Sequence, residues 1–443
     1  MSKPIFTALS PNTERDDVLL AFKLLFRPWR WKNGAHLSLL KKEFQDWLSS
    51  KHVFFFESGR TSLYAILNVL DLKNDDEVLL QAYTCIAVPE PILWVGAKPV
   101  YVDCDEETFN MSVVDLEKKI TAKSKVLIIQ HTFGYPADLG KLLEIAKKHN
   151  LFVIEDCAHA LGSTYEDKLV GTFGDASFFS FGRDKVISAV FGGVVSVKNP
   201  QIAAKIEAFW GICPLPSSGW IFHQLLHPVI MAFVKLTFNI YIGKIVQHLA
   251  LRFGILSKAV YREERKGLKP PFIFKQFPNA LAVLALKQFR KLDKFNQHRQ
   301  EIAGIYKSDL SHLQAQKELN NSRSIYLRYT IHMLHAHKIL KSAAKHKIFL
   351  GDWYTTSLAP EGVDYEKMQY TPSTCPVAEK LARETFNLPT NIQITKNEAE
   401  KIISFVKNYV TSNPNNGIKA GMGKLYFKSQ TANFFAFLVL GRV

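Results

Sequence analysis

Cysteine is scarce in this chain of 443 residues, and its positions show no pattern. The five cysteines are scattered and contain no C-x-x-C pair; they are Cys85, Cys104, Cys157, Cys213 and Cys375. This spacing argues against a disulfide framework and a cysteine-based zinc site, and it favours a reducing compartment. We therefore expect a protein without disulfides and without a metal centre.

Acidic residues are also few. The chain has 40 Asp and Glu against 56 Lys and Arg, which gives a formal net charge of +16. No acidic residue occurs from Ala208 to Arg262. A basic excess suits nucleic acid, an anionic lipid surface or an anionic substrate. Because no helix-turn-helix, RNA-binding or zinc-finger motif is present, we expect no nucleic-acid partner.

Two kinds of long hydrophobic run are missing. The first residues, MSKPIFTALSPNTERDD, contain no apolar core before a cleavage site, so we expect no signal peptide and a cytoplasmic location. The apolar stretch 220–256 is interrupted by Pro228, Lys235 and Lys244. No run in it reaches the roughly 18–20 residues that span a bilayer.

We interpret 220–256 as one or two basic, aromatic-rich helices that lie on an anionic membrane, at its inner face. Cations in this stretch would favour such a surface, and its aromatic and aliphatic residues would enter the interface. The alternative is a helical hairpin that packs on its own subunit or on a dimer mate.

Three apolar segments that resemble strands occur between residues 151 and 197. The segment 151–154 is followed by Glu155 and Asp156, and the segment 176–181 is followed by Lys185. The third segment, 193–197, carries the chain away from these residues. Ligands of open α/β sheets bind at the carboxyl ends of parallel strands. Asp156, Ser180 and Lys185 should therefore face one crevice.

These three side chains match the needs of pyridoxal 5′-phosphate (PLP). A carboxylate keeps the pyridine nitrogen protonated, a lysine forms a Schiff base with the aldehyde, and hydroxyl and backbone N–H groups hold the phosphate. Each residue alone has an ordinary explanation, as a helix cap or a solvated side chain. Their occurrence together and in this order favours a PLP site.

A turn of small residues, Glu57-Ser58-Gly59-Arg60-Thr61-Ser62, follows the apolar segment 53–56 and opens a helix. The free N–H groups and the positive dipole end of a helix N-terminus can bind an anion. The alternative is a plain helix cap.

The sequence resembles the DegT/DnrJ/StrS family of sugar aminotransferases in its most distinctive motifs. The family pattern joins an E-D-x-A-[QH]-A strand end, G-x-x-G-D, S-F-x-x-x-K and a glycine pair. Here these are Glu155 to Ala160, Gly171 to Asp175, Ser180 to Lys185, and Gly192-Gly193. The likeness extends from about Gly34 to Tyr409, with one interruption.

The resemblance implies PLP as cofactor and a role for each motif residue. Lys185 would be the catalytic residue that carries the cofactor, and Asp156 would pair with its pyridine nitrogen. His159 would lie against the cofactor face or its phenolic oxygen. The phosphate would be held by Ser180 and by the turn with Gly59, Arg60 and Thr61. Arg60 stands where the family usually has threonine, and we expect it to compensate for an N-x-R motif that is replaced by Phe274-Lys275-Gln276.

The resemblance also implies an α/β structure of PLP fold type I, with a mostly parallel, doubly wound sheet and a smaller C-terminal α+β domain. We expect an N-terminal arm at 1–33, a large PLP domain at 34–289 with a hydrophobic, basic insertion at 211–271, a small domain at 290–412, and a flexible basic tail at 413–443.

The expected activity is transfer of an amino group from an amino acid, L-glutamate in most of the family, to a nucleotide-linked keto sugar. A homodimer is the expected assembly. Two alternatives remain open: a dehydratase-like enzyme, against which Lys185 argues because that branch carries histidine there, and a non-catalytic sensor or scaffold at the membrane.

Overall fold

The computed structural model describes residues 3–270 and 272–413. A seven-stranded sheet in the order β2-β11-β10-β7-β6-β3-β5 forms its centre. Only β11 of this sheet is antiparallel to its neighbours. The strands are β2 (His52–Phe56), β3 (Glu77–Gln81), β5 (Lys98–Val102), β6 (Ser124–Gln130), β7 (Phe152–Asp156), β10 (Ala176–Ser180) and β11 (Gly193–Val197). The prediction of a mostly parallel sheet is confirmed.

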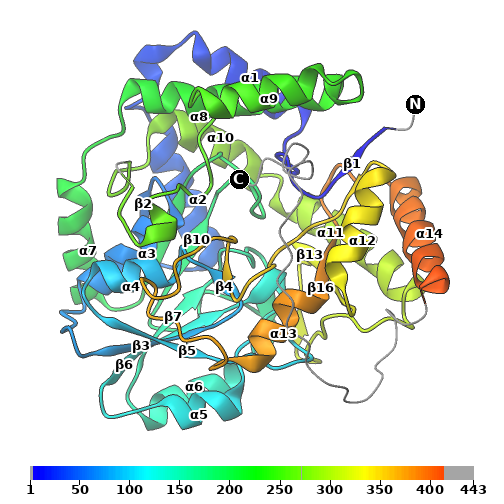
Figure 1. The fold of residues 1–443 in the computed structure, drawn as a ribbon. Coiled ribbons are helices and arrows are strands. Elements are labelled where there is room, and N and C mark those ends of the chain that lie inside the picture. The colour runs from blue at the N-terminus through cyan, green and yellow to red at the C-terminus, as the bar shows by residue number, and fades with distance from the viewer. Residues whose placement is uncertain (1–2, 271, 414–443) are drawn as a thin grey trace.

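Helices cover both faces of the sheet (Figure 1). One face packs against α2 (His36–Leu48), α6 (Leu139–Lys148) and α10 (Asn279–Phe289). The other packs against α3 (Gly59–Asn68), α7 (Pro200–Ile212) and α13 (Pro376–Glu384). Because both faces are buried, the strands carry apolar residues at successive positions instead of alternating with polar ones.

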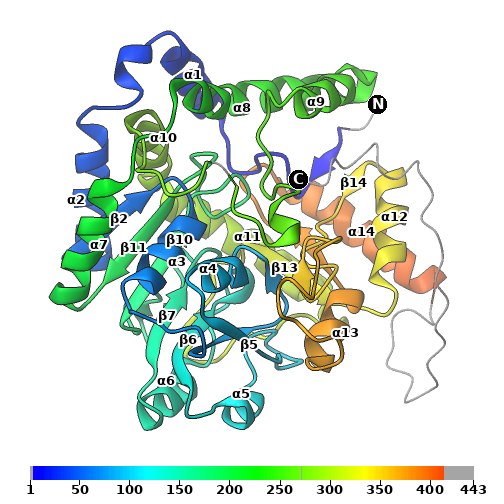
Figure 2. The same cartoon turned by 60° about the vertical axis from the view of Figure 1, so that its left-hand side comes forward.

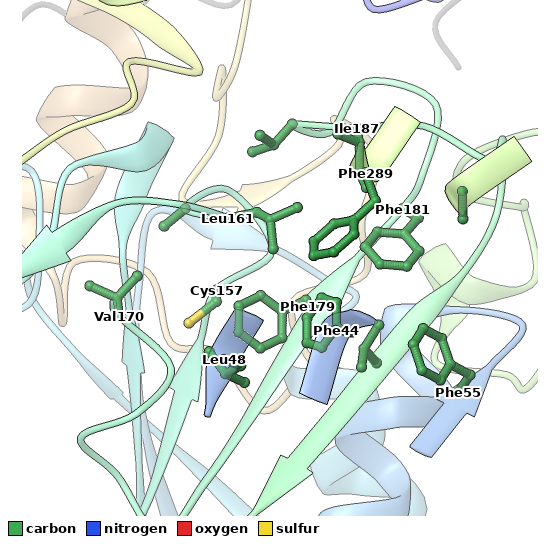
Figure 3. Packing of buried hydrophobic residues seen from close by; sticks show 14 of the residues in the cluster. Phe44, Leu48, Phe55, Cys157, Leu161, Val170, Phe179, Phe181, Ile187 and Phe289 are labelled. Atoms are coloured by element: carbon green, nitrogen blue, oxygen red, sulfur yellow. The ribbon is translucent and has the colours of Figure 1, made fainter. Parts of the chain in front are cut away.

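Phe44 of α2 is the centre of an aromatic cluster under one face of the sheet (Figure 3). Its ring centre lies 5.2 Å from that of Phe179 and 5.4 Å from that of Phe289. Phe55 and Phe181 complete the cluster at 6.0 and 6.3 Å. This packing fixes β10, and with it the position of Ser180 at the end of that strand.

The C-terminal part forms the α+β unit that the fold class requires, shown in yellow to red in Figure 1. Strands β13 (Arg328–His332) and β16 (Thr385–Pro389) pair antiparallel. Their apolar residues pack with α11 (Leu292–Asp309), α12 (Ala336–Lys345) and α14 (Lys396–Ser412). The N-terminal strand β1 (Ile5–Phe6) joins this part by pairing with β14 (Ile348–Phe349). The domain limits remain a prediction, and of the predicted tail only Asn413 is among the described residues.

The predicted insertion forms two helices, α8 (Ser218–Thr237) and α9 (Ile242–Arg252). They lie side by side with α1 (Arg15–Leu25) along one edge of the molecule (Figures 1 and 2). Tyr241 has a left-handed backbone with φ 65° at the turn between them. A Cβ at Gly243 would lie 2.3 Å from the Val234 carbonyl oxygen, so the close approach of the two helices requires glycine there.

The expectation that no segment of the insertion reaches membrane-spanning length is wrong. Helix α8 runs through both Pro228 and Lys235, and the segment Ser218–Ile240 is long and apolar enough to cross a membrane by length and composition. However, 44% of its most apolar window is buried inside the protein. Helix α8 packs against α1 and continues past Pro228, although a proline inside a helix costs about 3 kcal/mol.

Candidate active site

A cavity of about 300 Å³ lies at the carboxyl ends of the parallel strands. It brings together most of the predicted site residues, namely Gly59, Arg60, Asp156, His159, Ser180 and Lys185. They come from segments far apart in the chain, and the parallel sheet is the reason that they meet, since β2, β7 and β10 all end at this edge.

Asp156 is the last residue of β7 and is buried. Its Oδ1 accepts a hydrogen bond of 3.0 Å from the backbone N–H of Ala158. Burial raises the pKa of the Asp156 carboxyl, while this hydrogen bond and the nearby Lys185 ammonium oppose the increase. A cationic pyridinium beside the carboxylate would favour its ionised form in the same way.

Glu155 holds the loop behind Asp156 in place. Its carboxylate accepts hydrogen bonds from the N–H groups of Gly171 (2.7 Å), Phe173 (2.7 Å) and Gly174 (2.8 Å). Gly171 has φ +93°, and a Cβ there would lie 2.5 Å from the Phe179 ring. These bonds give a physical reason why the acid pair and the G-x-x-G-D motif occur together.

Lys185 lines the cavity in the loop after β10. Burial lowers the pKa of its amine, and the charges of Cys85, Asp156 and Asp184 oppose this decrease. Its Nζ lies 5.3 Å from the centre of the Trp353 ring. A lowered pKa increases the fraction of neutral amine, which is the form that attacks a carbonyl carbon.

The turn before α3 packs directly on Ser180. A Cβ at Gly59 would lie 3.3 Å from the Ser180 Cβ, and Ser58 caps the helix by accepting a hydrogen bond from the Thr61 N–H at 3.2 Å. A Cβ at Gly193 would come within 2.2 Å of the Ser58 carbonyl oxygen. Glycine at 193 therefore lets β11 pass beside the turn, and the helix N-terminus and the Ser180 hydroxyl face the same space.

Thr61, predicted as a cofactor-binding residue, does not line the cavity. Its hydroxyl donates a 2.5 Å hydrogen bond to Glu57 and accepts one of 3.1 Å from the Phe274 N–H. Thr61 occupies the third position of α3, where the side chain turns back into the protein. Its role in the structure is to hold the turn against Glu57.

Arg60 lines the cavity but is already bound by the insertion. Its guanidinium forms an ion pair with buried Glu264 and donates a 2.5 Å hydrogen bond to the Ala259 carbonyl oxygen. The ion pair reduces the positive charge that Arg60 can offer to a phosphate. The sequence does not reveal this contact, because Arg60 and Glu264 are distant in the chain.

His159 lies on the cavity wall within a group of parallel rings. It stacks with Phe133 at 5.7 Å and with Trp353 at 5.4 Å between ring centres. Burial lowers the pKa of His159 well below its usual value, and the charges of Lys185 and Arg328 add to this effect. The neutral imidazole can therefore lie against a flat, electron-poor ring.

Arg328 and Trp353 are among the cavity residues that sequence reasoning missed. The Arg328 guanidinium lies 4.9 Å from the Trp353 ring centre and donates a 2.5 Å hydrogen bond to the Thr7 carbonyl oxygen. Neither residue belongs to a motif. The alternating segment around Arg328 indicated a strand, but nothing in it indicated a site.

The residues of the cavity fit PLP. It offers a buried carboxylate for the pyridine nitrogen, an amine for the aldehyde, a flat ring for one face, and a helix N-terminus with a hydroxyl for the phosphate. Fold and site thus define a PLP-dependent enzyme of fold type I.

Comparison with known proteins identifies the family. The model of the DegT/DnrJ/EryC1/StrS aminotransferase family matches residues 13–213 and 273–407. GDP-perosamine synthase of Escherichia coli O157:H7 is 31% identical over 303 residues, which are 68% of this chain and 70% of the relative. Spore coat polysaccharide biosynthesis protein SpsC of Bacillus subtilis strain 168 is 29% identical over 298 residues, 67% of each chain.

Among solved structures, the aminotransferase PseC of Helicobacter pylori, involved in the biosynthesis of pseudoaminic acid, is similar with a TM-score of 0.72. The two chains are 20% identical, and the match covers 93% of this chain and all of the other. The chain belongs to the DegT/DnrJ/EryC1/StrS aminotransferase family and is a PLP-dependent transaminase. Residues 214–272, between the two matched segments, overlap the predicted insertion at 211–271.

Glu57 gives the site a testable dependence on pH. Burial raises its pKa from 4.5 to about 7, although Thr61, the Lys275 N–H and Ser58 donate hydrogen bonds to it. The folded state therefore binds a proton more tightly than the unfolded state. The stability that this proton provides is complete below pH 4.5, is lost as the pH rises through 7, and amounts to roughly 3 kcal/mol.

We expect Glu57→Gln to remove this part of the pH dependence of the free energy of unfolding. Urea denaturation at several pH values between about 5 and 8 measures it. The exposed Glu117→Gln is the matched control and should keep the slope of the parent. An unchanged slope in Glu57→Gln would contradict the assignment.

Proposed function

We propose that the enzyme transfers the amino group of an amino acid, L-glutamate, to a nucleotide-linked keto sugar. The observation that carries the proposal is the cavity in which Asp156, Ser180 and Lys185 meet beside the helix N-terminus. The similarity to a GDP-perosamine synthase supports a nucleotide-linked acceptor, and that to SpsC supports a place in polysaccharide biosynthesis.

The proposed chemistry assigns one task to each side chain. Bound PLP supplies an electron sink for the carbon that loses its proton. The Asp156 carboxylate keeps the pyridine nitrogen protonated. Lys185 would hold the cofactor through its aldehyde, and its Nζ, once free, would accept the proton that the donor carbon loses. Gly59, Ser180 and Arg60 would hold the phosphate, and His159 would lie against the ring.

The two alternatives predict different behaviour. The family's dehydratase branch has histidine in place of the lysine, which this chain retains as Lys185. A non-catalytic sensor would bind PLP without converting it to the amine form when L-glutamate is added.

We expect Lys185→Ala to abolish both covalent attachment of PLP and amino transfer. Borohydride reduction followed by peptide mass spectrometry should find PLP on Lys185 in the parent and on no lysine in the variant. Turnover with L-glutamate and a panel of nucleotide-linked keto sugars should fall by roughly 10⁴-fold or more. Lys148→Ala, at an exposed lysine of α6, is the control. Retained covalent attachment and turnover in Lys185→Ala would disprove the assignment.

We propose further that the enzyme is cytoplasmic and binds the inner membrane face as a peripheral protein. Support comes from the apolar platform, which we define as the exposed hydrophobic side chains of α1, α8, α9 and the turns that follow them. Its members are Leu19, Phe22, Phe26, Phe222, Phe233, Leu236, Ile240, Tyr241, Ile242, Ile245, Leu249 and Phe253. Such a patch on a basic, acid-free hairpin suits an anionic lipid surface.

One predicted membrane-facing cation lies elsewhere. Lys235 is turned inward, where its Nζ donates hydrogen bonds to the Ser10 carbonyl oxygen (3.2 Å) and to Gln393 (3.3 Å). Burial lowers its pKa to about 8. Arg252 is exposed, and Lys244 lies over the Phe238 and Tyr241 rings at 4.7 and 4.5 Å. Substitution of hydrophobic residues of the platform is therefore a better test of membrane binding than replacement of Lys235, Lys244 and Arg252 by glutamate.

We expect the triple change Leu236→Ser, Ile240→Ser and Ile245→Ser to reduce vesicle binding by roughly tenfold or more, because it removes the apolar area that would enter lipid. These residues are 85%, 60% and 58% exposed. Co-sedimentation with vesicles of equal parts phosphatidylglycerol and phosphatidylcholine measures it, and salt should release part of the parent protein.

The control is the double change Val114→Ser and Ile212→Ser, at residues 64% and 80% exposed on α5 (Val113–Lys119) and at the end of α7. It should bind vesicles like the parent.

We also propose a homodimer, as the resemblance implies, and light scattering on the same proteins measures the assembly. Equal vesicle binding by all of them would disprove the membrane proposal, and dissociation of a dimer in the triple variant would assign the platform to the dimer interface.

A further inference from the structure

The catalytic cavity extends onto the inner side of the insertion. Helix α8 contributes His227 and Met231 to its wall, and α9 contributes Gln247 and Leu251. Leu256, in the segment after α9, continues this wall. The insertion therefore has two sides with different surroundings: an outer side that forms the apolar platform and an inner side that faces the reacting groups.

His227 is the most unusual member of this wall. It is 4% exposed, and its Nε2 lies 3.2 Å from the Ser10 hydroxyl oxygen. Its Nδ1 has no hydrogen-bond partner among the described residues. Burial lowers the pKa of His227 well below its usual value, and the charges of Arg183 and Lys235 add to this effect. The ring is therefore neutral and carries one unused polar atom.

Asp184, next to Lys185 in the chain, has a matching unused atom. Its Oδ1 is buried and also lacks a hydrogen-bond partner within the described part of the chain. Asp184 lines the same cavity. His227 lines it too, and the charges of Arg183 and Lys235 act on both side chains.

A buried polar network fixes the insertion against the catalytic loop. Arg183 donates hydrogen bonds to the carbonyl oxygen (2.5 Å) and the hydroxyl oxygen (2.9 Å) of Ser257. The Ser257 hydroxyl in turn donates a 2.7 Å hydrogen bond to Gln224 of α8. Because Gln224 lies one helical turn before His227, this chain of bonds sets the position of the imidazole relative to Lys185.

We propose that Asp184 and His227 bind hydroxyl groups of the acceptor sugar. This inference rests on the proposed function and names the residues that select its acceptor. A buried polar atom without a partner costs about 1–3 kcal/mol, and a hydroxylated substrate relieves that cost at both atoms. The Asp184 carboxylate accepts a hydrogen bond from one hydroxyl, and His227 Nδ1 exchanges one with another. Met231, Leu251 and Leu256 provide apolar contacts for the C–H groups of the sugar ring.

Two amide variants of His227 separate this role from a structural one. The amide of His227→Asn places a polar atom near Nδ1, whereas that of His227→Gln places one near Nε2 and keeps the contact with Ser10. We expect His227→Gln to lower kcat/KM for the acceptor by roughly tenfold or more, and His227→Asn to stay within about threefold of the parent. The spectral change of bound PLP with L-glutamate, which does not involve the acceptor, should proceed at the parent rate in both.

A binding measurement makes the test independent of turnover. Calorimetry on the pyridoxamine phosphate form, with UDP-glucose and GDP-mannose as unreactive probes, should show binding of at least one probe. His227→Gln and Asp184→Ala should weaken that binding by roughly tenfold, and His227→Asn should not.

The inference is overturned if neither probe binds, if all variants bind like the parent, or if His227→Gln and His227→Asn behave alike. Failure of the proposed function gives a different result: the probes bind and the variants rank as expected, but no keto sugar in the panel accepts the amino group.

Discussion

The electrostatic relation between Asp156 and Lys185 is the constraint on which the site depends. Both groups line the cavity, where burial raises the pKa of the acid and lowers that of the amine. Each charge favours the ionised form of the other. The Ala158 N–H also favours the Asp156 carboxylate, and the Asp184 charge also favours the Lys185 ammonium. A bound pyridinium would take over the role of counter-ion for Asp156 and leave Lys185 free to react.

The sheet positions Asp156 and Lys185, and the insertion forms part of the cavity wall around them. Glu155 fixes the loop that follows Asp156, and the Phe44 cluster fixes the strand that leads to Lys185. Residues 257–264 of the insertion contact both Arg60 and Arg183. The insertion, which departs from the family, is thus part of the wall of the active site. Its outer side, the apolar platform, is left exposed to contact a membrane or a partner subunit.

Much of the fold and most of the site could be predicted from the sequence because the relevant residues follow directly after strands. The carboxyl ends of parallel strands meet at one edge of the sheet, which is why Asp156 and Ser180, and Lys185 in the loop after Ser180, could be expected to line one cavity. Trp353 and Arg328 could not be found in this way, since the packing of the C-terminal part brings them to the cavity. Thr61 and Lys235 show a second limit: the face of a helix on which a side chain lies depends on what the helix packs against.

Asp156→Asn, followed in a rapid-mixing experiment with L-glutamate, tests whether Asp156 acts on a PLP bound through Lys185. The absorbance of bound PLP reports the rate at which the donor converts it to the amine form. We expect the variant to bind PLP but to convert it at least roughly a hundredfold more slowly, because the uncharged amide cannot keep the pyridine nitrogen protonated. An unchanged rate in Asp156→Asn would contradict it.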